Sequence, residues 1–530
     1  ELVSCGKRWH FGLEAGSKAE LLIALSLIDD PEALLICNGY KDQRYIETAI
    51  LARRLGRRPV VVIEQADEVQ RIIAASEALG AAPLIGIRAR LSSRSTGRWG
   101  SSVGEKAKFG LPVPEILATV EALREANLLE ELRLLHFHVG SQINDIAVVK
   151  DALQEASRMY VELHALGAPM GYLDVGGGLG IDYDGSRTAT AASTNYSLQN
   201  YANDVVATVQ EGCAPHGVAV PTLVSESGRA IASHFSVLVF DVLGSGGLQQ
   251  SAPPEADEEP LIVRNLRDTL AGIHTLPAEA TADGSRLQEA WNDALKFKAD
   301  ALAAFRLGYL SLQNRSLAEQ LTWACARALL DRLPEDGTLP EDLKELPAVL
   351  AETYYANLSI FRSAPDTWAI QQLFPVMPLH RLDEKPTRLG HFADLTCDSD
   401  GRLSRFISDG RSKPLLELHP LIADQPYLIG LFLGGAYQEV MGNLHNLFGS
   451  TDAVHIRLAP GGDYQVDHVV RGDTNADVLQ AMEHVPDLLL ERLRIASEQA
   501  ISRGALRISD ARLLMDHLES SLRQSTYLKN

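Results

Sequence analysis

Seven β-rich apolar runs alternate with helical segments over the first 230 residues, and this alternation limits the folds open to the chain. The runs occupy residues 9–15, 33–39, 59–65, 83–91, 132–140, 172–178 and 221–228. Strands separated by amphipathic helices form parallel βα units, in which each strand is buried on both faces. A doubly wound open sheet and a closed (β/α)8 barrel both fit this pattern.

The start of the chain favours the barrel. A closed barrel needs eight strands. The stretch ELVSCG is typical of a last helical turn with Gly6 as its C-cap. A helix that ends there follows a strand in a βα unit, so we expect the eighth strand to precede residue 1. We therefore predict a TIM-type α/β barrel over residues 1–234, with seven of its eight strands present.

The rest of the chain differs in texture, and 530 residues are too many for a single core. A strand-like run at residues 235–250 starts a β-domain. An acidic, proline-bearing linker follows this run. Apolar residues spaced by three and four then predict a helical insertion over residues 251–367. These residues are Leu287, Trp291, Leu295, Leu302, Phe305 and Tyr309.

Two further segments complete the expected domain organisation. Short β-rich runs predict a mainly antiparallel β-domain over residues 368–475, including a hairpin with PGGD as its turn. Residues 476–530 are expected to form a helical C-terminal region.

Charge and composition exclude several classes of partner. The chain has 49 Lys and Arg against 69 Asp and Glu, a net charge of −20, which argues against nucleic acid or an anionic membrane. No apolar run approaches the length of a bilayer span, and the N-terminus has no signal-peptide core. The five cysteines are scattered without a CxxC pair, so we expect a cytoplasmic protein without disulfides.

Polar residues cluster where the predicted strands end, which is where barrels carry their chemistry. They are Glu14, Ser17, Lys18, Asn38, Gly39, Tyr40, Glu64, Arg88, Arg90, His136–Ser141, Gly176–Gly178 and Glu226–Arg229. Glycines and a serine beside Arg229 are typical of an anion site, because bare N–H groups and a guanidinium bind phosphate. A tight βα turn is the alternative explanation for the three consecutive glycines Gly176, Gly177 and Gly178.

Two side chains at these ends suggest the kind of anion. His138 offers a flat ring, and Glu226 offers a carboxylate that would keep a pyridine nitrogen protonated. Beside a phosphate site, this pair favours pyridoxal phosphate as the cofactor. Taken singly, His138 could be a core histidine and Glu226 a solvated or ion-paired acid.

Motifs along the whole chain then become recognisable as a set. GLEAGSKAEL, CNGYKD, KFGL, LLHFHVGSQ, DVGGGLGIDY, SESGRA, PLHRLDE, TCDSDG and GAYQEVMGNLHNLFG occur in this order. Together they resemble the biosynthetic arginine decarboxylases, which belong to the barrel-plus-β-domain class of pyridoxal-phosphate decarboxylases. The resemblance runs from residue 11 to the closing STYLKN, and the helical insertion favours the arginine branch.

The resemblance implies a role for each motif in the cofactor site. His138 stacks on the cofactor ring, and Glu226 pairs with the ring nitrogen. The remaining contacts implied are to the phosphate: Ser141, Gly176, Gly177, Gly178, Gly228, Arg229 and, from the β-domain, Tyr437. A core position is the alternative for Tyr437.

The resemblance also implies a homodimer with shared active sites, or a larger homo-oligomer. In this arrangement Cys397 and Asp398 come from the partner subunit. The cysteine protonates the substrate carbon, and the aspartate holds the distal cationic end of the substrate. The family is associated with Mg²⁺, for which no decisive ligand cluster is visible.

The residue types suit this chemistry. A thiol is a suitable acid near neutrality, and Asp398 and Asp400 could bind a guanidinium. A simple β-turn is the alternative for DSDG, and a buried small residue is the alternative for Cys397.

The predicted function is the pyridoxal-phosphate-dependent decarboxylation of L-arginine to agmatine and CO₂, the first step towards putrescine and spermidine. A decarboxylase of ornithine, lysine or diaminopimelate, a barrel racemase and a non-catalytic homologue are the alternatives.

The Schiff-base lysine expected from the resemblance lies on the strand that would precede residue 1. The lysines nearest to the predicted strands that could take the place of this Schiff-base lysine are Lys7, Lys18, Lys41 and Lys108. Lys7 is expected at the opposite face of the barrel, and the other three as charged loop or helix-start residues. We therefore predict that the chain by itself is poorly soluble, binds the cofactor weakly and releases no CO₂.

Overall fold

The computed structural model describes residues 2–92, 107–247, 252–255, 258–277, 285–333, 343–409 and 411–529. The chain divides into two compact units, Glu1–Ser236 and Val237–Asn530.

The first unit is a sheet of seven parallel strands whose spatial order follows the chain from β1 to β7. The strands are β1 (Leu13–Ala15), β2 (Leu34–Cys37), β3 (Arg58–Ile63), β4 (Leu84–Arg88), β5 (Leu132–His136), β6 (Tyr172–Asp174) and β7 (Thr222–Val224). All seven expected strands are present. Because the order never reverses, the doubly wound alternative is wrong.

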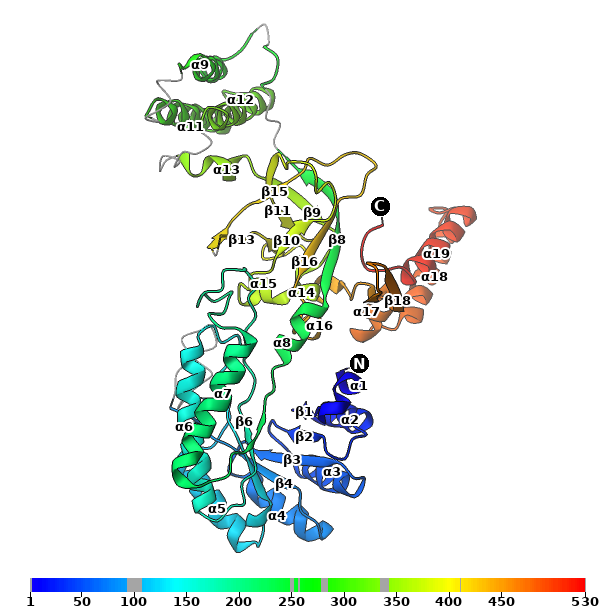
Figure 1. The fold of residues 1–530 in the computed structure, drawn as a ribbon. Helices are drawn as coiled ribbons and strands as arrows, with labels where there is room; N and C mark the ends of the chain where they lie inside the picture. Colours follow the sequence, from blue (N-terminus) through cyan, green and yellow to red (C-terminus); the bar gives the residue numbers. More distant parts are fainter. Residues whose placement is uncertain are drawn as a thin grey trace. The chain divides into compact units, whose positions relative to one another are not determined.

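Helices follow the strands and surround them on the outer side (Figure 1). They are α2 (Lys18–Leu27), α3 (Gln43–Arg54), α4 (Glu68–Leu79), α5 (Val113–Glu125), α6 (Ile146–Ala165), α7 (Leu198–Cys213) and α8 (Gly228–Ala232), with short 3-10 turns η4 (Leu129–Glu131), η5 (Ala214–His216) and η6 (Ser233–Phe235). Polar caps begin several of them: the side chains of Ser17, Asp42 and Asp145 accept backbone N–H groups at the starts of α2, α3 and α6.

The first α-helix ends at Gly6 as expected, but Gly6 has right-handed backbone angles, φ −83° and ψ −7°, rather than those of a left-handed C-cap. Helix α1 (Leu2–Gly6) continues into the 3-10 turn η1 (Lys7–Trp9), and His10 takes the left-handed conformation at φ 55°. A Cβ at Gly6 would lie 2.3 Å from the Cβ of Phe11. Close packing therefore explains this glycine, and the predicted C-cap role is wrong.

The second unit contains a seven-stranded, mainly antiparallel sheet of order β10-β16-β8-β9-β11-β12, with β15 also paired to β11. Its strands are β8 (Val237–Gly246), β9 (Glu352–Ala356), β10 (Val376–Pro378), β11 (Arg388–Ala393), β12 (Arg402–Leu403), β15 (Leu416–Leu418) and β16 (Leu428–Phe432). The other elements are the pair β13 (Phe406–Ser408) and β14 (Arg411–Lys413), the helices α14 (Ile360–Ser363), α15 (Pro365–Ala369) and α16 (Gln438–Met441), and the turn η8 (His445–Leu447).

Strand β9 lies where the sequence predicted helical insertion as far as residue 367. The β-branched and aromatic segment ETYYA pairs with β8 and, in parallel, with β11. Tyr354 of this segment is fully buried against Phe392. The helical pattern therefore ends before β9, because this short segment completes the core of the sheet.

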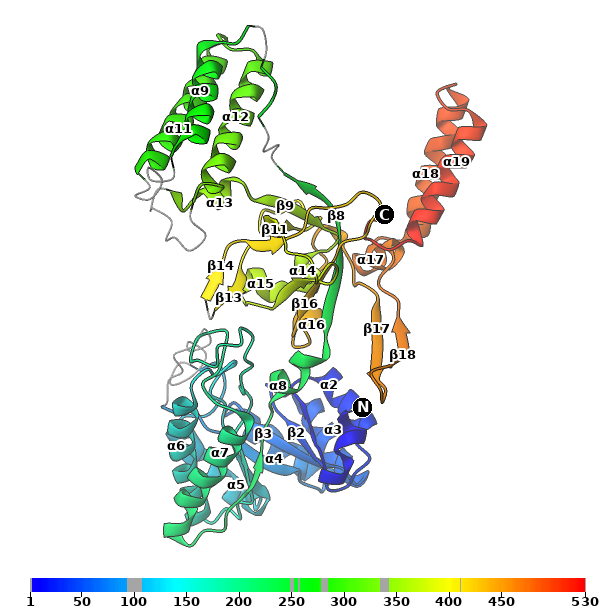
Figure 2. The same cartoon turned by 45° about the horizontal axis from the view of Figure 1, so that its top comes forward.

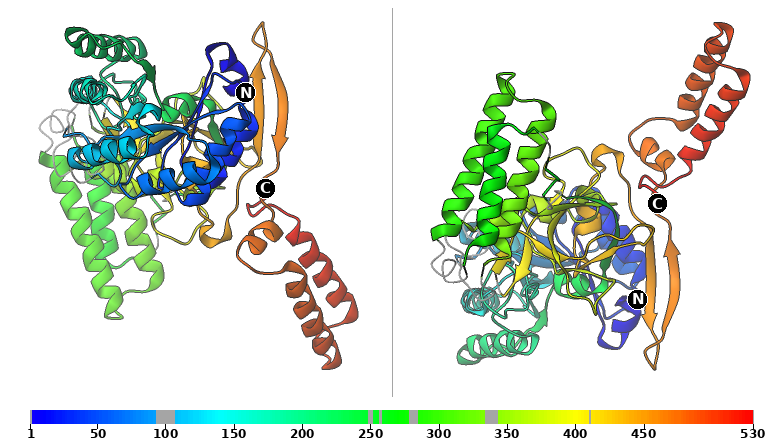
Figure 3. Two further views of the ribbon diagram at one scale, coloured as in Figure 1. Left: turned by 90° about the horizontal axis from the view of Figure 1, so that it is seen from below. Right: turned by 90° about the horizontal axis from the view of Figure 1, so that it is seen from above.

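Three long helices pack side by side in the insertion (Figures 2 and 3). The helices here are α9 (Leu261–Thr275), α11 (Ser285–Arg306), α12 (Leu312–Leu330) and the short α13 (Leu346–Val349). Leu287 and Trp291 are buried between them as expected, but Leu295 and Tyr309 are exposed. The spacing therefore identified the helix and only part of its buried face.

The C-terminal part begins with the predicted hairpin. Strands β17 (Ala453–Leu458) and β18 (Tyr464–Val470) pair across the PGGD turn, in which Gly461 and Gly462 have φ of 93° and 86°. The helices α17 (Asn475–Ala481), α18 (Pro486–Ser502) and α19 (Ile508–Leu522) follow. Across the described ranges, no helix is both long and apolar enough to cross a membrane.

Candidate active site

The glycine run after β6 packs against the loop after β5. Gly176 and Gly178 have positive φ of 68° and 96°, and added Cβ atoms would lie 2.3 Å from the carbonyl oxygen of Phe137 and 2.2 Å from that of Gly140. A Cβ on Gly177 would lie 3.4 Å from Nε2 of His138. The glycines thus let the strand-end loops approach closely, and a Cβ on Gly177 would also lie 2.8 Å from the carbonyl oxygen of Glu226.

Arg229 brings a guanidinium to the same end of the sheet. This buried side chain donates to the hydroxyl of Tyr183 at 2.9 Å and to that of Ser141 at 3.2 Å. Ser233 lies 3.2 Å from the same tyrosine hydroxyl. One guanidinium and three hydroxyls therefore lie together, and these are groups that can donate hydrogen bonds to an anion. Tyr183 and Ser233 had no predicted role, although Tyr183 lies in the quoted motif DVGGGLGIDY.

Gly228 begins α8 directly before Arg229. No heavy atom lies within 4 Å of the place where its Cβ would be. Gly228 is the glycine of the SESGRA motif that was predicted to contact the cofactor, and the space beside its backbone is open. That space suits a ligand that approaches the backbone beside the guanidinium.

His138 is a neutral ring. Its Nδ1 accepts the backbone N–H of Gly140 at 2.9 Å. Burial, with added effects of Arg88 and His136, lowers the pKa of His138 to about 3. An uncharged imidazole of fixed orientation suits the stacking role that was expected for it.

Glu226 is held by polar groups from other strands. Asn38 donates its side-chain amide to one carboxylate oxygen at 2.6 Å, and Nε2 of His136 lies 3.9 Å from the other. Burial raises the pKa of Glu226 to about 7; His136 lowers it, and Asp174 raises it. The sequence had placed Asn38 and His136 at strand ends without assigning either a role, and it had not singled out Asp174.

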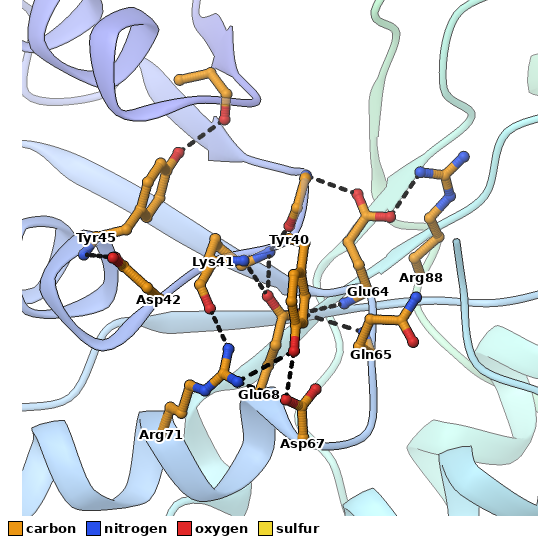
Figure 4. Close-up of polar contacts among 12 residues, drawn as sticks. Tyr40, Lys41, Asp42, Tyr45, Glu64, Gln65, Asp67, Glu68, Arg71 and Arg88 are labelled. Carbon is orange, nitrogen blue, oxygen red and sulfur yellow. Dashed lines mark hydrogen bonds and ion pairs between the residues drawn. The ribbon is translucent and has the colours of Figure 1, made fainter. Parts of the chain in front are cut away.

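Further acids line the ends of β1 and β3. Burial and the nearby Glu226 raise the pKa of Glu14 to about 7. Glu64 is fully buried and accepts the backbone N–H of Gly39 at 2.9 Å and the guanidinium of Arg88 at 2.7 Å (Figure 4). The strand ends therefore gather several acids, and Glu64 is the one among them with a charged partner within 3 Å in the described part of the chain.

Comparison with known proteins identifies the family. Residues 3–233 match the pyridoxal-dependent decarboxylase, pyridoxal binding domain. Over its whole length the chain is 76% identical to the biosynthetic arginine decarboxylase of Parasynechococcus marenigrum and 74% identical to that of Prochlorococcus marinus, and it covers 82% of each. The chain belongs to the biosynthetic arginine decarboxylases.

The other segments match models specific to this family. Residues 256–347 match the arginine decarboxylase helical bundle domain and residues 476–528 its C-terminal helical extension. The crystal structure of the biosynthetic arginine decarboxylase from Campylobacter jejuni, at 32% identity, superposes with a TM-score of 0.84 and covers 100% of this chain and 83% of that one. The predicted family and fold class, a TIM-type barrel unit with a separate β-domain and helical parts, are confirmed.

A diaminopimelate decarboxylase from Helicobacter pylori shares the fold at a TM-score of 0.56 and 16% identity, with 91% of this chain and 86% of that one covered.

In the second unit of this arginine decarboxylase chain, the TCDSDG loop is tied to its surroundings. The backbone N–H of Cys397 donates to the side chain of Asn446 at 3.1 Å, and Nε2 of His445 lies 3.8 Å from the carboxylate of Asp398. The thiol of Cys397 is exposed, so the alternative of a buried small residue is wrong.

The turn proposed as an alternative for DSDG is present. Gly401 donates its N–H to the carbonyl oxygen of Asp398 at 3.1 Å, and the side chain of Asp398 accepts the N–H of Asp400 at 2.9 Å. Both acids are exposed. Tyr437 is 46% exposed with φ 70°, so its alternative as a core tyrosine is wrong.

Lys41 lies in the loop between β2 and α3, as the sequence suggested, but its side chain is buried. It is 1% exposed and donates to the carbonyl oxygen of Gly39, and its Nζ lies 3.1 Å from the buried carboxylate of Glu68 (Figure 4). Lys18 and Lys7 form exposed ion pairs with Asp42 and Asp29. The predicted loop position of Lys41 is therefore confirmed, but its side chain is buried because it neutralises the buried Glu68.

One trio among the described residues could offer atoms to a metal. The ligand atoms of His136, Asp174 and Glu226 lie within 4.8 Å of one another. Mg²⁺ prefers oxygen ligands in an octahedron and keeps several waters. A buried set with an imidazole at its centre does not fit that ion.

Proposed function

We propose that this protein decarboxylates L-arginine to agmatine and CO₂ with pyridoxal phosphate, as the first step towards polyamines. The observation that carries the proposal is the 76% identity, over all 530 residues, to a biosynthetic arginine decarboxylase. The strand ends supply the residue types that this reaction needs.

The residues of the first unit fit the cofactor. The guanidinium of Arg229 and the hydroxyl of Ser141 would hold the phosphate, with Gly228 and the glycines Gly176–Gly178 at the backbone. Neutral His138 would face the ring, and Glu226 its nitrogen. When bound, pyridoxal phosphate supplies an electron-accepting ring for the loss of CO₂.

The second unit would handle the substrate. We propose that Asp398, with Asp400, binds the guanidinium of arginine, and that the exposed thiol of Cys397 returns a proton to the α-carbon. We further propose a homodimer, or a larger homo-oligomer, in which these residues act in the partner's site and Tyr437 contacts the phosphate.

The cellular compartment and the role of Mg²⁺ are also matters of proposal. The cytoplasm is the compartment we propose, since all five cysteines are free thiols. We derive no step through Mg²⁺, because the one trio found among the described residues does not fit it.

We also propose that none of Lys7, Lys18, Lys41 and Lys108 forms the imine with the cofactor. The buried ion pair with Glu68 occupies Lys41, and exposed ion pairs occupy Lys18 and Lys7. On this proposal the 530 residues alone release no CO₂ from arginine.

The alternatives differ at the far end of the substrate. An ornithine, lysine or diaminopimelate decarboxylase would share every cofactor contact, but the helical bundle at residues 256–347 matches a model specific to arginine decarboxylases. A racemase would need a second base in place of the Cys397 loop. A non-catalytic homologue would not need the full set of strand-end residues that this chain retains.

The test is the release of CO₂ by the protein expressed from its whole reading frame. With carboxyl-labelled L-arginine we expect turnover that depends on added pyridoxal phosphate, and at least a hundredfold lower kcat/KM for lysine and ornithine. Faster release from either of these would overturn the substrate. Conversion of L- to D-arginine without CO₂ would favour the racemase.

A further inference from the structure

Three ionisable side chains from neighbouring strand ends lie in a row. Asp174 is the last residue of β6, His136 is the last of β5, and Glu226 follows β7. Nδ1 of His136 lies 3.3 Å from Oδ2 of Asp174, and its Nε2 lies 3.9 Å from Oε2 of Glu226. The imidazole thus contacts both carboxylates, which also lie within 4.8 Å of each other and interact directly.

Two of the three side chains are cut off from water, and that of Glu226 is 13% exposed. Asp174 is 0% and His136 1% exposed. Nδ1 of the histidine and Oδ2 of the aspartate are buried and have no hydrogen-bond partner among the described residues, yet they face each other. A buried polar atom is unfavourable without a partner. Each of these atoms is therefore the partner that the other requires.

This arrangement determines which atoms of the three side chains carry protons. The other oxygen of Asp174 already accepts the backbone N–H of Gly176 at 2.9 Å. If Oδ2 accepts the proton on Nδ1, then Nε2 either presents a lone pair to Glu226 or carries a second proton. A lone pair against a carboxylate is repulsive, so one proton must lie on Nε2 or on the carboxyl group of Glu226.

Other polar and charged groups surround the row of Asp174, His136 and Glu226. Asn38 donates to the oxygen of Glu226 that does not face the histidine. Glu14 and Glu64 add negative charge, and Arg88 and Lys41 add positive charge, from β1, β3, β4 and the loop after β2. Both oxygens of Glu226 therefore have assigned neighbours, and His136 and Asp174 are the groups that can exchange a proton with it.

We propose that Asp174 and His136 are positioning residues that orient Glu226 and share one proton with it. The inference rests on the proposed function in one respect: Glu226 is the group that faces the cofactor ring. Asp174 holds the imidazole in one orientation, and the imidazole sets both the position and the charge of the glutamate. The carboxyl group that would face the ring nitrogen can then pass its proton to the imidazole of His136.

The test follows the carboxyl group of Glu226 directly, without the cofactor. The whole-reading-frame protein is prepared cofactor-free with carboxyl-labelled glutamate, and the ¹³C signal lost in Glu226→Gln is assigned to residue 226. Its titration midpoint is then measured in Asp174→Asn, which still accepts the N–H of Gly176. An asparagine amide donates to Nδ1, so Nε2 carries its proton towards Glu226. We expect the midpoint to fall by one pH unit or more.

The double variant Asp174→Asn, His136→Leu reverses this shift. It removes the donor that faces Glu226 and leaves no unpaired buried acid, so the midpoint should rise above that of Asp174→Asn alone. His419→Gln, a buried histidine in the second unit, is the matched control and should leave the midpoint unchanged. In the cofactor-loaded protein, the same two variants should shift the absorption of the ring in opposite senses.

Two results would overturn the proposal. An unchanged midpoint in Asp174→Asn would show that the row carries no coupling. Movement of both variants towards about 4.3, the value of a hydrated glutamate, would show that water has entered and that the residues are only structural. Failure of the proposed function is distinguishable, because the cofactor-free titration does not depend on it.

Discussion

Asn38 donates a 2.6 Å hydrogen bond to Glu226 although the two residues are 188 positions apart in the chain. The bond joins the end of β2 to the loop after β7. It fixes one carboxylate oxygen of Glu226 at the end of the sheet where the glycines and Arg229 also lie.

Replacement of Glu226 by glutamine tests the central acid. The change keeps the shape and removes the charge, so the whole-reading-frame protein should keep its fold and most of its cofactor affinity. Its kcat should fall by orders of magnitude, since about 1.4 kcal/mol of barrier corresponds to tenfold in rate. Near-normal turnover in steady-state assays would refute the role of Glu226.

Substitutions of two glycines distinguish an effect on folding stability from an effect on cofactor binding. Gly176→Ala places a Cβ 2.3 Å from a carbonyl oxygen at positive φ, so we expect a loss of about 2 kcal/mol or more in unfolding free energy. Gly228→Ala meets no atom within 4 Å and should leave thermal stability unchanged while weakening cofactor affinity. Urea unfolding and cofactor titration measure the two effects. Equal melting temperatures for both variants would contradict the packing account.

Stability should depend on pH through Glu14. Its pKa is raised to about 7 in the folded protein, against about 4.3 unfolded, so the folded state binds more protons in between. Its contribution to stability is present below about pH 4 and is lost as the pH rises to about 7. Urea unfolding between pH 5 and 8 should therefore show a shallower fall for Glu14→Gln than for the parent. Parallel curves would contradict the raised pKa.

Shared active sites predict complementation. A Cys397→Ala chain and a Glu226→Gln chain are each nearly inactive, but a mixed dimer has one site with both residues intact if Cys397 acts across the interface. Random mixing should then restore about a quarter of the parent activity. Mixed dimers detected by differential tags, but without recovered turnover, would place Cys397 in the site of its own chain.

The lysines offer a covalent test. After incubation of the 530-residue chain with pyridoxal phosphate and borohydride, we expect no turnover and no stoichiometric pyridoxyl group on Lys7, Lys18, Lys41 or Lys108. The buried Lys41 is the sharpest case, since its amine lies 3.1 Å from Glu68. Peptide mapping by mass spectrometry reads the result. A labelled lysine together with CO₂ release would disprove the expectation.

Local sequence patterns determined much of this protein. Each of the seven parallel strands and the PGGD hairpin was predictable, because the apolar runs and turn glycines carry their own conformational preference. The same patterns placed His138, Gly176–Gly178 and Glu226 at strand ends, where a barrel carries its chemistry. Motif order alone was enough to indicate the family.

Only the tertiary structure decided which of these residues meet. The row of Asp174, His136 and Glu226, the burial of Lys41 against Glu68 and the inclusion of β9 in the second sheet all depend on contacts between distant segments. Sequence periodicity reports which face of an element is buried but not what it is buried against. A charge buried by the fold then takes the partner that the fold places beside it, and its pKa follows from that partner and from the loss of water.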